Sequence, residues 1–270
     1  MTILEYYDIM CRKTDFTFRG WLKMDRTKWK VLDRGMIKYI AMFTMLLNHI
    51  STIFMESGNF LSELFLDVGY FTAIIMCYFL VEGYQYTHSK KKYAYRLMAF
   101  ALISEIPYCL AFTKNGILEF RGLNMIFTLL ICFCIILTAE KVKNIVWKVL
   151  FISMLILLSL ISDWALLAPI FTLLFIWANG SRKKVKVAFI ISIILFGLFN
   201  FVGGIGRFSV NTNILYALGS IVGMALAAIT ILYFYNGKQM KRGKAFSKWF
   251  FYWFYPVHLL VLGIIRVSLL

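Results

Sequence analysis

The sequence predicts an all-α fold, a polytopic transmembrane helix bundle of about nine spans. Of its 270 residues, 61% are hydrophobic and 16% are charged, whereas an ordinary soluble domain is less apolar and more highly charged. The apolar residues form long segments, and the basic residues fall mainly in the short loops between them. A soluble domain of this length could not bury so much apolar surface, so membrane lipid must solvate much of it.

Nine apolar segments define the predicted spans: 35–55, 68–85, 95–112, 124–139, 145–161, 163–179, 186–203, 212–235 and 249–269. The fourth, fifth and sixth are short against the roughly 20 residues that a full crossing needs. Only Ser162 and Asp163 separate the fifth from the sixth, so a re-entrant hairpin is the alternative there. We expect a basic cytoplasmic segment, residues 1–34, with an interfacial helix near residues 16–29. A single transmembrane domain, residues 35–270, follows it.

The distribution of Lys and Arg predicts the orientation. Over the loops, 24 basic residues fall on one side and four on the other, and basic loops tend to stay in the cytoplasm. We therefore expect the N-terminus inside, the C-terminus outside, and residues 56–67 as an outer connection. The net charge of +16 does not indicate nucleic-acid binding, because the basic residues lie where membrane topology places them. The predicted location is the cytoplasmic membrane of a bacterial-type cell.

Two histidines inside apolar segments, His49 and His258, are the first candidate functional residues. Imidazole is the side chain best suited to move a proton near neutral pH, and ionisable groups at membrane depth usually line a cavity or pathway. In the last segment a polar helical face, at spacings of 4, 3 and 3, comprises Lys248, Tyr252, Tyr255 and His258. Pro256 is expected to kink this helix just before His258.

Other polar side chains in the spans have both functional and structural readings. Glu82 could take part in the chemistry or only pair with Arg96. Glu105 could take part in the chemistry or only cap local structure before Pro107. Asn124 opens the fourth span, and Asp163 with the adjacent Trp164 could form an ordinary interfacial turn. A lone intramembrane histidine is often only a hydrogen-bond donor between helices. Four of the five cysteines lie in or at the ends of apolar segments, where inert buried thiols are expected, and no zinc-binding, nucleophile-elbow or P-loop motif is present.

Most of residues 35–265 resembles the TraX family, named for a conjugal-transfer protein that acetylates the N-terminus of pilin. The matching stretches are Ile40-Ala41, Met45 to Ile50, Phe79 to Tyr84 with Thr87, Tyr95 to Leu97, Phe100 to Pro107, Asn124 with Phe127-Thr128, Tyr235 to Lys238, Lys248, Phe251-Tyr252 and Phe254 to Leu259. More distantly, the chain is similar to multi-span acyltransferases that take an acetyl group from cytoplasmic acetyl-CoA. The resemblance implies an acetyl-CoA-dependent membrane acetyltransferase without a metal, acting on an amine or hydroxyl of a peptide or cell-envelope acceptor.

The resemblance also implies residue roles. His258 is the favoured base, with His49 as its partner across a cavity, and an acetyl-histidine intermediate is an alternative to direct transfer. Glu82 or Glu105 would fix a histidine tautomer, while Asn124, Tyr255 and Arg96 would orient groups or donate to the oxyanion. The residues expected to hold the coenzyme are Arg96, Asn236, Lys238 and Lys248.

Two departures from the family pattern bear on the acceptor side. Asn48 precedes His49 where the family often has Asp, which removes a carboxylate partner for the imidazole. Tyr70 follows Gly69 where the family often has Arg, which removes a basic group at the outer rim. Two other classes of function stay open: a proton-coupled transporter with His49, His258, Glu82 and Glu105 as the relay, and an export partner or scaffold in which these residues only join helices.

Overall fold

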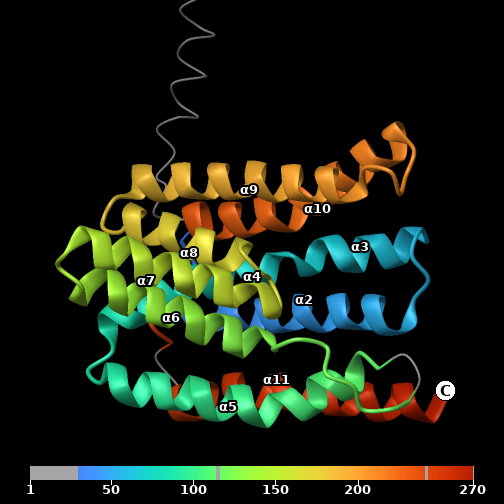
Figure 1. Cartoon of the computed structure of the whole chain (residues 1–270), viewed down its shortest axis with the longest axis horizontal. Helices are drawn as coiled ribbons and strands as arrows, with labels where there is room; N and C mark the ends of the chain where they lie inside the picture. Colours follow the sequence, from blue (N-terminus) through green and yellow to red (C-terminus); the bar gives the residue numbers. More distant parts are fainter. Residues whose placement is uncertain (1–29, 114–115, 241–242, 270) are drawn as a thin grey trace, which may run out of the picture.

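The computed structural model describes residues 30–113, 116–240 and 243–269, and within these ranges the chain is helical apart from loops and two isolated β-bridges. The interfacial helix predicted near residues 16–29 lies outside them. Figure 1 shows long helices running side by side along the longest axis of the molecule. The helices are α2 (Arg34–Phe54), α3 (Phe60–Gly69), α4 (Phe71–Tyr86), α5 (Lys90–Ala111), α6 (Met125–Lys141), α7 (Ile145–Leu158), η1 (Ser159–Ile161), α8 (Leu167–Ala178), α9 (Arg182–Gly204), α10 (Val210–Ile229), η2 (Thr230–Phe234) and α11 (Lys244–Leu269).

Each of the nine predicted segments coincides with a helix or a pair of consecutive helices. In the part of the chain that the structure describes, six helical segments are long and apolar enough to cross a membrane: Arg34–Phe54, Phe60–Tyr86, Lys90–Ala111, Arg182–Gly204, Val210–Phe234 and Phe246–Leu269. The all-α membrane fold is therefore confirmed, while the count of nine spans and the orientation stay predictions.

The predicted start of the second span was wrong. Most of the expected outer connection 56–67 is helix α3, and α3 with α4 forms one apolar segment of 27 residues. Glu63 and Asp67 lower the hydropathy of this stretch, and for that reason the sequence did not predict α3 as part of the apolar segment. Glu63 accepts the Gly58 N–H at 2.8 Å near the start of α3, and Asp67 faces glycines of α10, so both charges are accommodated.

The helices α6, α7 and α8 occupy one end of the bundle. In Figure 1 they crowd the end at which α2 and α11 begin and stop short of the end that holds the C-terminus. With 12 residues at about 1.5 Å each, α8 is shorter than a hydrocarbon core of about 30 Å. This length favours the re-entrant alternative for residues 145–179 over two full crossings.

The loop between η1 and α8 is held in place by backbone hydrogen bonds. The N–H of Leu123 donates to the carbonyl of Ile161 at 2.8 Å, and the N–H of Asp163 donates to the carbonyl of Leu123 at 2.8 Å. Trp164 and Leu166 have φ values of 57° and 61°, a conformation that costs a non-glycine residue about 1–3 kcal/mol. Irregular backbone of this kind is tolerated at membrane depth where it is buried in protein or lines a cavity.

The core is centred on α4 and α6, whereas α7 lies at the periphery. Ten of the 16 residues of α4 are buried, so this helix is covered on all sides. None of the 14 residues of α7 is buried, and the helix packs mainly on α6. We infer that α7 presents its surface to lipid.

Close packing of α10 on α3 and α4 depends on Gly223. A Cβ at this position would overlap the carbonyl oxygen of Asp67 and lie 2.9 Å from the backbone nitrogen of Phe71. Backbone atoms cannot move aside as a flexible side chain can. Small residues at such crossings allow helices to approach closely in membranes.

Replacing Gly223 with alanine should lower the free energy of unfolding by about 1–3 kcal/mol, the usual cost of overpacking. Thermal unfolding in detergent measures the effect. Gly203→Ala in α9 is the matched control, because a Cβ there meets nothing within 4 Å and alanine favours helix. Equal melting temperatures for the two variants would contradict the proposed packing.

Candidate active site

His49 of α2 and His258 of α11 form a direct hydrogen bond. Nδ1 of His49 lies 2.8 Å from Nε2 of His258, and each residue is only 7% exposed. The ring planes differ by 7° and the ring centres are 5.0 Å apart. Since the ring centres are 5.0 Å apart and the two nitrogens are 2.8 Å apart, the rings lie edge to edge in nearly one plane. The hydrogen bond is therefore well aligned.

The surroundings determine which nitrogen of each neutral imidazole carries the proton. Nδ1 of His258 lies 2.7 Å from the carbonyl oxygen of Phe254, which only accepts, so this nitrogen is the donor. Nε2 of His258 is then an acceptor and receives the Nδ1–H of His49. The remaining nitrogen, Nε2 of His49, consequently carries a lone pair.

His49, which carries this lone pair, lines an outer cavity of about 610 Å³, named here for its predicted side of the membrane. His258 is not among the residues that line this cavity. Within the described residues, Nε2 of His49 has no hydrogen-bond partner. It is also absent from the fully buried polar atoms that lack a partner, so this nitrogen is accessible. The polar and aromatic residues around it include Asn48, Tyr70, Tyr108, Arg121, Asp163, Trp164 and Tyr255. Arg121 thus supplies a basic group to the cavity that Tyr70 also lines.

A second, inner cavity of about 450 Å³ lies toward the beginnings of α2 and α11. Its charged lining residues in the described part of the chain are all basic: Arg34, Lys38, Arg96 and Lys248. The ammonium of Lys38 lies 5.0 Å from the centre of the Phe251 ring, and Nε of Arg96 donates to the Tyr252 hydroxyl at 3.4 Å. Lys38 and Arg96 have no ion-pair partner among the described residues, so the cavity is suited to an anion.

The two cavities share four lining residues: Met45, Thr72, Met125 and Tyr255. The Tyr255 oxygen accepts the backbone N–H of Met125 at 3.2 Å, at the start of α6, which leaves its own proton free to donate. One face of α2, at spacings of 4, 4, 3 and 4, runs through both cavities: Arg34, Lys38, Met42, Met45 and His49.

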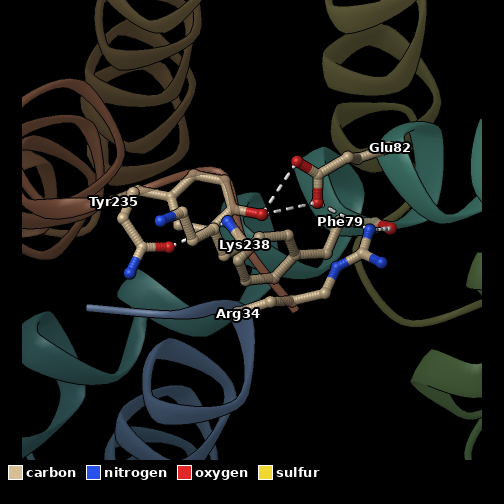
Figure 2. A network of polar contacts seen from close by, with 6 residues as sticks. Arg34, Phe79, Glu82, Tyr235 and Lys238 are labelled. Carbon is tan, nitrogen blue, oxygen red and sulfur yellow. Dashed lines mark hydrogen bonds and ion pairs between the residues drawn. The ribbon is translucent and has the colours of Figure 1, made fainter. Parts of the chain in front are cut away.

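Glu82 belongs to a separate network at the beginning of α2, shown in Figure 2. It forms an ion pair with Arg34 at 2.6 Å and accepts the Tyr235 hydroxyl proton at 2.9 and 3.0 Å. The N–H of Arg34 donates to the Lys238 carbonyl at 3.0 Å, and the Asn236 side chain accepts the Lys238 N–H at 2.8 Å. These contacts fasten the chain after η2 to the start of α2. Asn236 and Lys238 do not line the inner cavity, so their predicted coenzyme contacts gain no support here.

Glu105 and Asn124 form another separate pair. The Asn124 side-chain amide donates to Glu105 at 2.7 Å and to the Ala101 carbonyl at 2.8 Å, and its oxygen accepts the Ile126 N–H at 3.0 Å. This geometry is that of a helix N-cap. Neither Glu105 nor Glu82 has a hydrogen bond to a histidine among the described residues. The carbonyl of Phe254 takes the tautomer-fixing role that was expected of a carboxylate.

Sequence reasoning missed Arg34 and Lys38 at the inner cavity and Arg121 at the outer one. Lys38 counts as an isolated charge in a span when hydropathy alone is considered. Its spacing of four residues from Arg34 and from Met42, on the helical face that also carries His49, is the signal that could have found it.

Comparisons with known proteins place the chain in one family. The chain is 28% identical, over 237 residues, to a probable fimbrial assembly protein FimC, serogroup H1, of Dichelobacter nodosus. The match covers 84% of this chain and 92% of that protein. No solved structure matches this chain. The family described as TraX protein matches residues 33–266, which include both histidines and both cavities. The resemblance inferred from the sequence is therefore confirmed, and the chain belongs to the TraX family.

Proposed function

We propose that this protein is a membrane-embedded acetyltransferase that moves an acetyl group from acetyl-CoA in the inner cavity to an amine or hydroxyl in the outer cavity. One observation carries the proposal: a basic inner cavity and a histidine-bearing outer cavity meet at Tyr255. The acyl donor is polyanionic, whereas its reacting thioester is neutral and lies at the far end of a narrow arm.

The inner cavity suits the donor's phosphates. Lys38, Arg96 and Lys248 present cations there, and charged hydrogen bonds to phosphate are stronger than neutral ones. The apolar wall provided by Met42 and Met45 suits the arm that ends in the thioester. In this proposal the acetyl carbonyl reaches the four residues that the two cavities share.

The chemistry follows from two groups at the junction. The Tyr255 hydroxyl donates a hydrogen bond to the thioester oxygen as it gains negative charge. Nε2 of His49 takes the proton of the attacking amine or hydroxyl, the new C–N or C–O bond forms, and the C–S bond breaks. His49 then gives this proton to the thiolate, and its Nδ1–H stays bonded to His258 throughout. The same lone pair could instead attack the carbonyl and form an acetyl-histidine intermediate.

The proposed acceptor is a peptide or another cell-envelope component. The printed name of the Dichelobacter relative, a probable fimbrial assembly protein, supports an envelope setting. The six apolar segments support an integral location, which we propose to be the cytoplasmic membrane.

The Lys38→Met and Arg96→Met variants test the donor site. Each should raise the dissociation constant of radiolabelled acetyl-CoA by about tenfold, because a hydrogen bond to a charged group is worth about 1.5–3 kcal/mol. Equilibrium binding to the detergent-solubilised protein measures the effect, which should shrink at high salt.

Lys186→Met is the matched control, since Lys186 is an exposed cation of α9 outside the inner cavity. Unchanged binding in both cavity variants, or no binding to the wild-type protein, would rule out acetyl-CoA as the ligand of this cavity.

A further inference from the structure

The outer cavity contains a carboxylate that the fold does not need. Asp163 holds its loop through its backbone: its N–H donates to the Leu123 carbonyl at 2.8 Å, and its carbonyl accepts the Thr128 hydroxyl at 2.5 Å. Asp163 lines the outer cavity, and its side chain has no ion-pair partner among the described residues. A carboxylate without a cation inside a membrane protein is costly and calls for an explanation in terms of function.

Arg121, the basic residue that lines the same cavity, already has an ion-pair partner. The guanidinium of Arg121 forms an ion pair with the carboxylate of Glu119 at 2.9 Å. Glu119 itself does not line the cavity. Asp163 lines the same cavity as His49 and Tyr255, and Tyr255 is one of the residues that this cavity shares with the inner one. The carboxylate therefore belongs to the cavity in which the acetyl group is proposed to be transferred.

An aromatic wall adjoins the carboxylate. Trp164 and Phe196 are stacked with ring centres 5.3 Å apart and planes 16° apart, and Tyr70 meets both rings edge to face at 5.9 and 4.8 Å. All three rings line the outer cavity. Aromatic faces attract cations, and they do so more strongly where water is excluded.

We propose that Asp163 binds the positively charged amine of the acceptor in the outer cavity and holds it against the aromatic wall beside His49. This inference rests on the proposed acetyltransferase function and makes it more specific. Its new element is the residue: it assigns recognition of the ammonium group to Asp163.

The proton balance requires two acceptors. The amine enters as R–NH₃⁺ and gives one proton to the Asp163 carboxylate, which leaves a neutral amine. As the C–N bond forms and the C–S bond breaks, Nε2 of His49 takes a second proton and passes it to the thiolate. Asp163 releases its proton to the outer side. Acetyl-CoA and R–NH₃⁺ thus yield the acetamide, free coenzyme and one proton.

Dodecylamine and dodecanol test the proposal, because they share a chain length and differ in the charged group. The whole protein in detergent is heated with each compound, and label transfer from radiolabelled acetyl-CoA is followed in parallel. We expect dodecylamine to raise the melting temperature of the wild-type protein more than dodecanol does, and Asp163→Asn to abolish that difference. In the transfer assay, Asp163→Asn should lower kcat/KM for dodecylamine by about 10–100-fold, because both amine binding and the first proton transfer depend on the carboxylate, and it should leave acetyl-CoA binding unchanged.

Glu119→Gln is the matched control, since it removes the same charge from a carboxylate outside the cavity, and it should behave as wild type. Equal stabilisation of wild type and Asp163→Asn by dodecylamine would overturn the assignment, whatever the transfer assay gives. Failure of the acetyltransferase proposal looks different: the charge-dependent stabilisation persists, but no label reaches the amine.

Discussion

Replacing His49 with glutamine should lower the rate of acetyl transfer by about 10²–10⁴-fold, the usual contribution of a positioned acid–base group. The physical reason is the hydrogen-bond chain, in which the Phe254 carbonyl fixes His258 and His258 fixes His49. Only Nε2 of His49 is left with a lone pair, and His49 lines the outer cavity. The rate constant for label transfer measures the loss, and acetyl-CoA binding should stay within about twofold of wild type.

His258→Gln is the control that separates the two histidines. A glutamine there can still accept the Nδ1–H of His49, so we expect the loss of rate to be about tenfold. The sequence favoured His258 as the base, and this comparison decides between that prediction and His49. A His49→Gln variant that keeps most of its activity, while His258→Gln loses it, would contradict the assignment of the base to His49.

Replacing Tyr255 with phenylalanine should lower kcat by about 10²–10³-fold, as removal of an oxyanion donor does in other acyl transfers. The hydroxyl lies where the cavities meet, and the Met125 N–H engages its oxygen at 3.2 Å. The same change leaves that N–H without its partner, at a cost of about 1–3 kcal/mol in stability. Steady-state kinetics and thermal unfolding on one preparation measure both effects.

Tyr252→Phe provides the comparison on the same helix. Its hydroxyl accepts a hydrogen bond from Arg96 at 3.4 Å in the inner cavity and does not reach the outer one. We expect it to raise KM for acetyl-CoA with little change in kcat. If Tyr255→Phe shows that pattern instead, the hydroxyl binds the ground state and does not stabilise the transition state.

Much of the fold could be predicted because hydropathy reports directly on solvation by lipid. All nine apolar segments correspond to helices. The helix α3 was missed because hydropathy treats Glu63 and Asp67 as breaks, although local and interhelical packing accommodates both. The number of membrane crossings could not be predicted, because it depends on the length of α8. The predicted segment 163–179 has 17 residues, but it includes loop residues, and the helix itself has only 12.

The site was predicted only in part, because contacts between distant residues depend on tertiary packing. The two histidines are 209 residues apart in the chain, and no pattern along it shows that they touch. The hydrogen bond between them arises from the packing of α2 on α11. Asn236 and Lys238 shape a turn against the start of α2, and their coenzyme contacts stay predictions.

The transporter alternative loses support from the same contacts. A relay through His49, His258, Glu82 and Glu105 needs hydrogen bonds that join them. Among the described residues, Glu82 bonds Arg34 and Tyr235, while Glu105 bonds Asn124, so neither carboxylate is joined to the histidine pair. Two cavities that share four lining residues, Tyr255 among them, fit the proposed group transfer better than a proton path.

The most direct test is the side of the membrane from which acetyl-CoA acts. Wild-type protein is reconstituted in sealed vesicles of known orientation, radiolabelled acetyl-CoA is supplied from one side only, and transfer to dodecylamine is measured. We predict transfer when acetyl-CoA is on the side where α2 and α11 begin, next to Lys248, and only background from the opposite side. Equal transfer from both sides, or transfer only from the side of the C-terminus, would contradict passage of the acetyl group from the inner to the outer cavity.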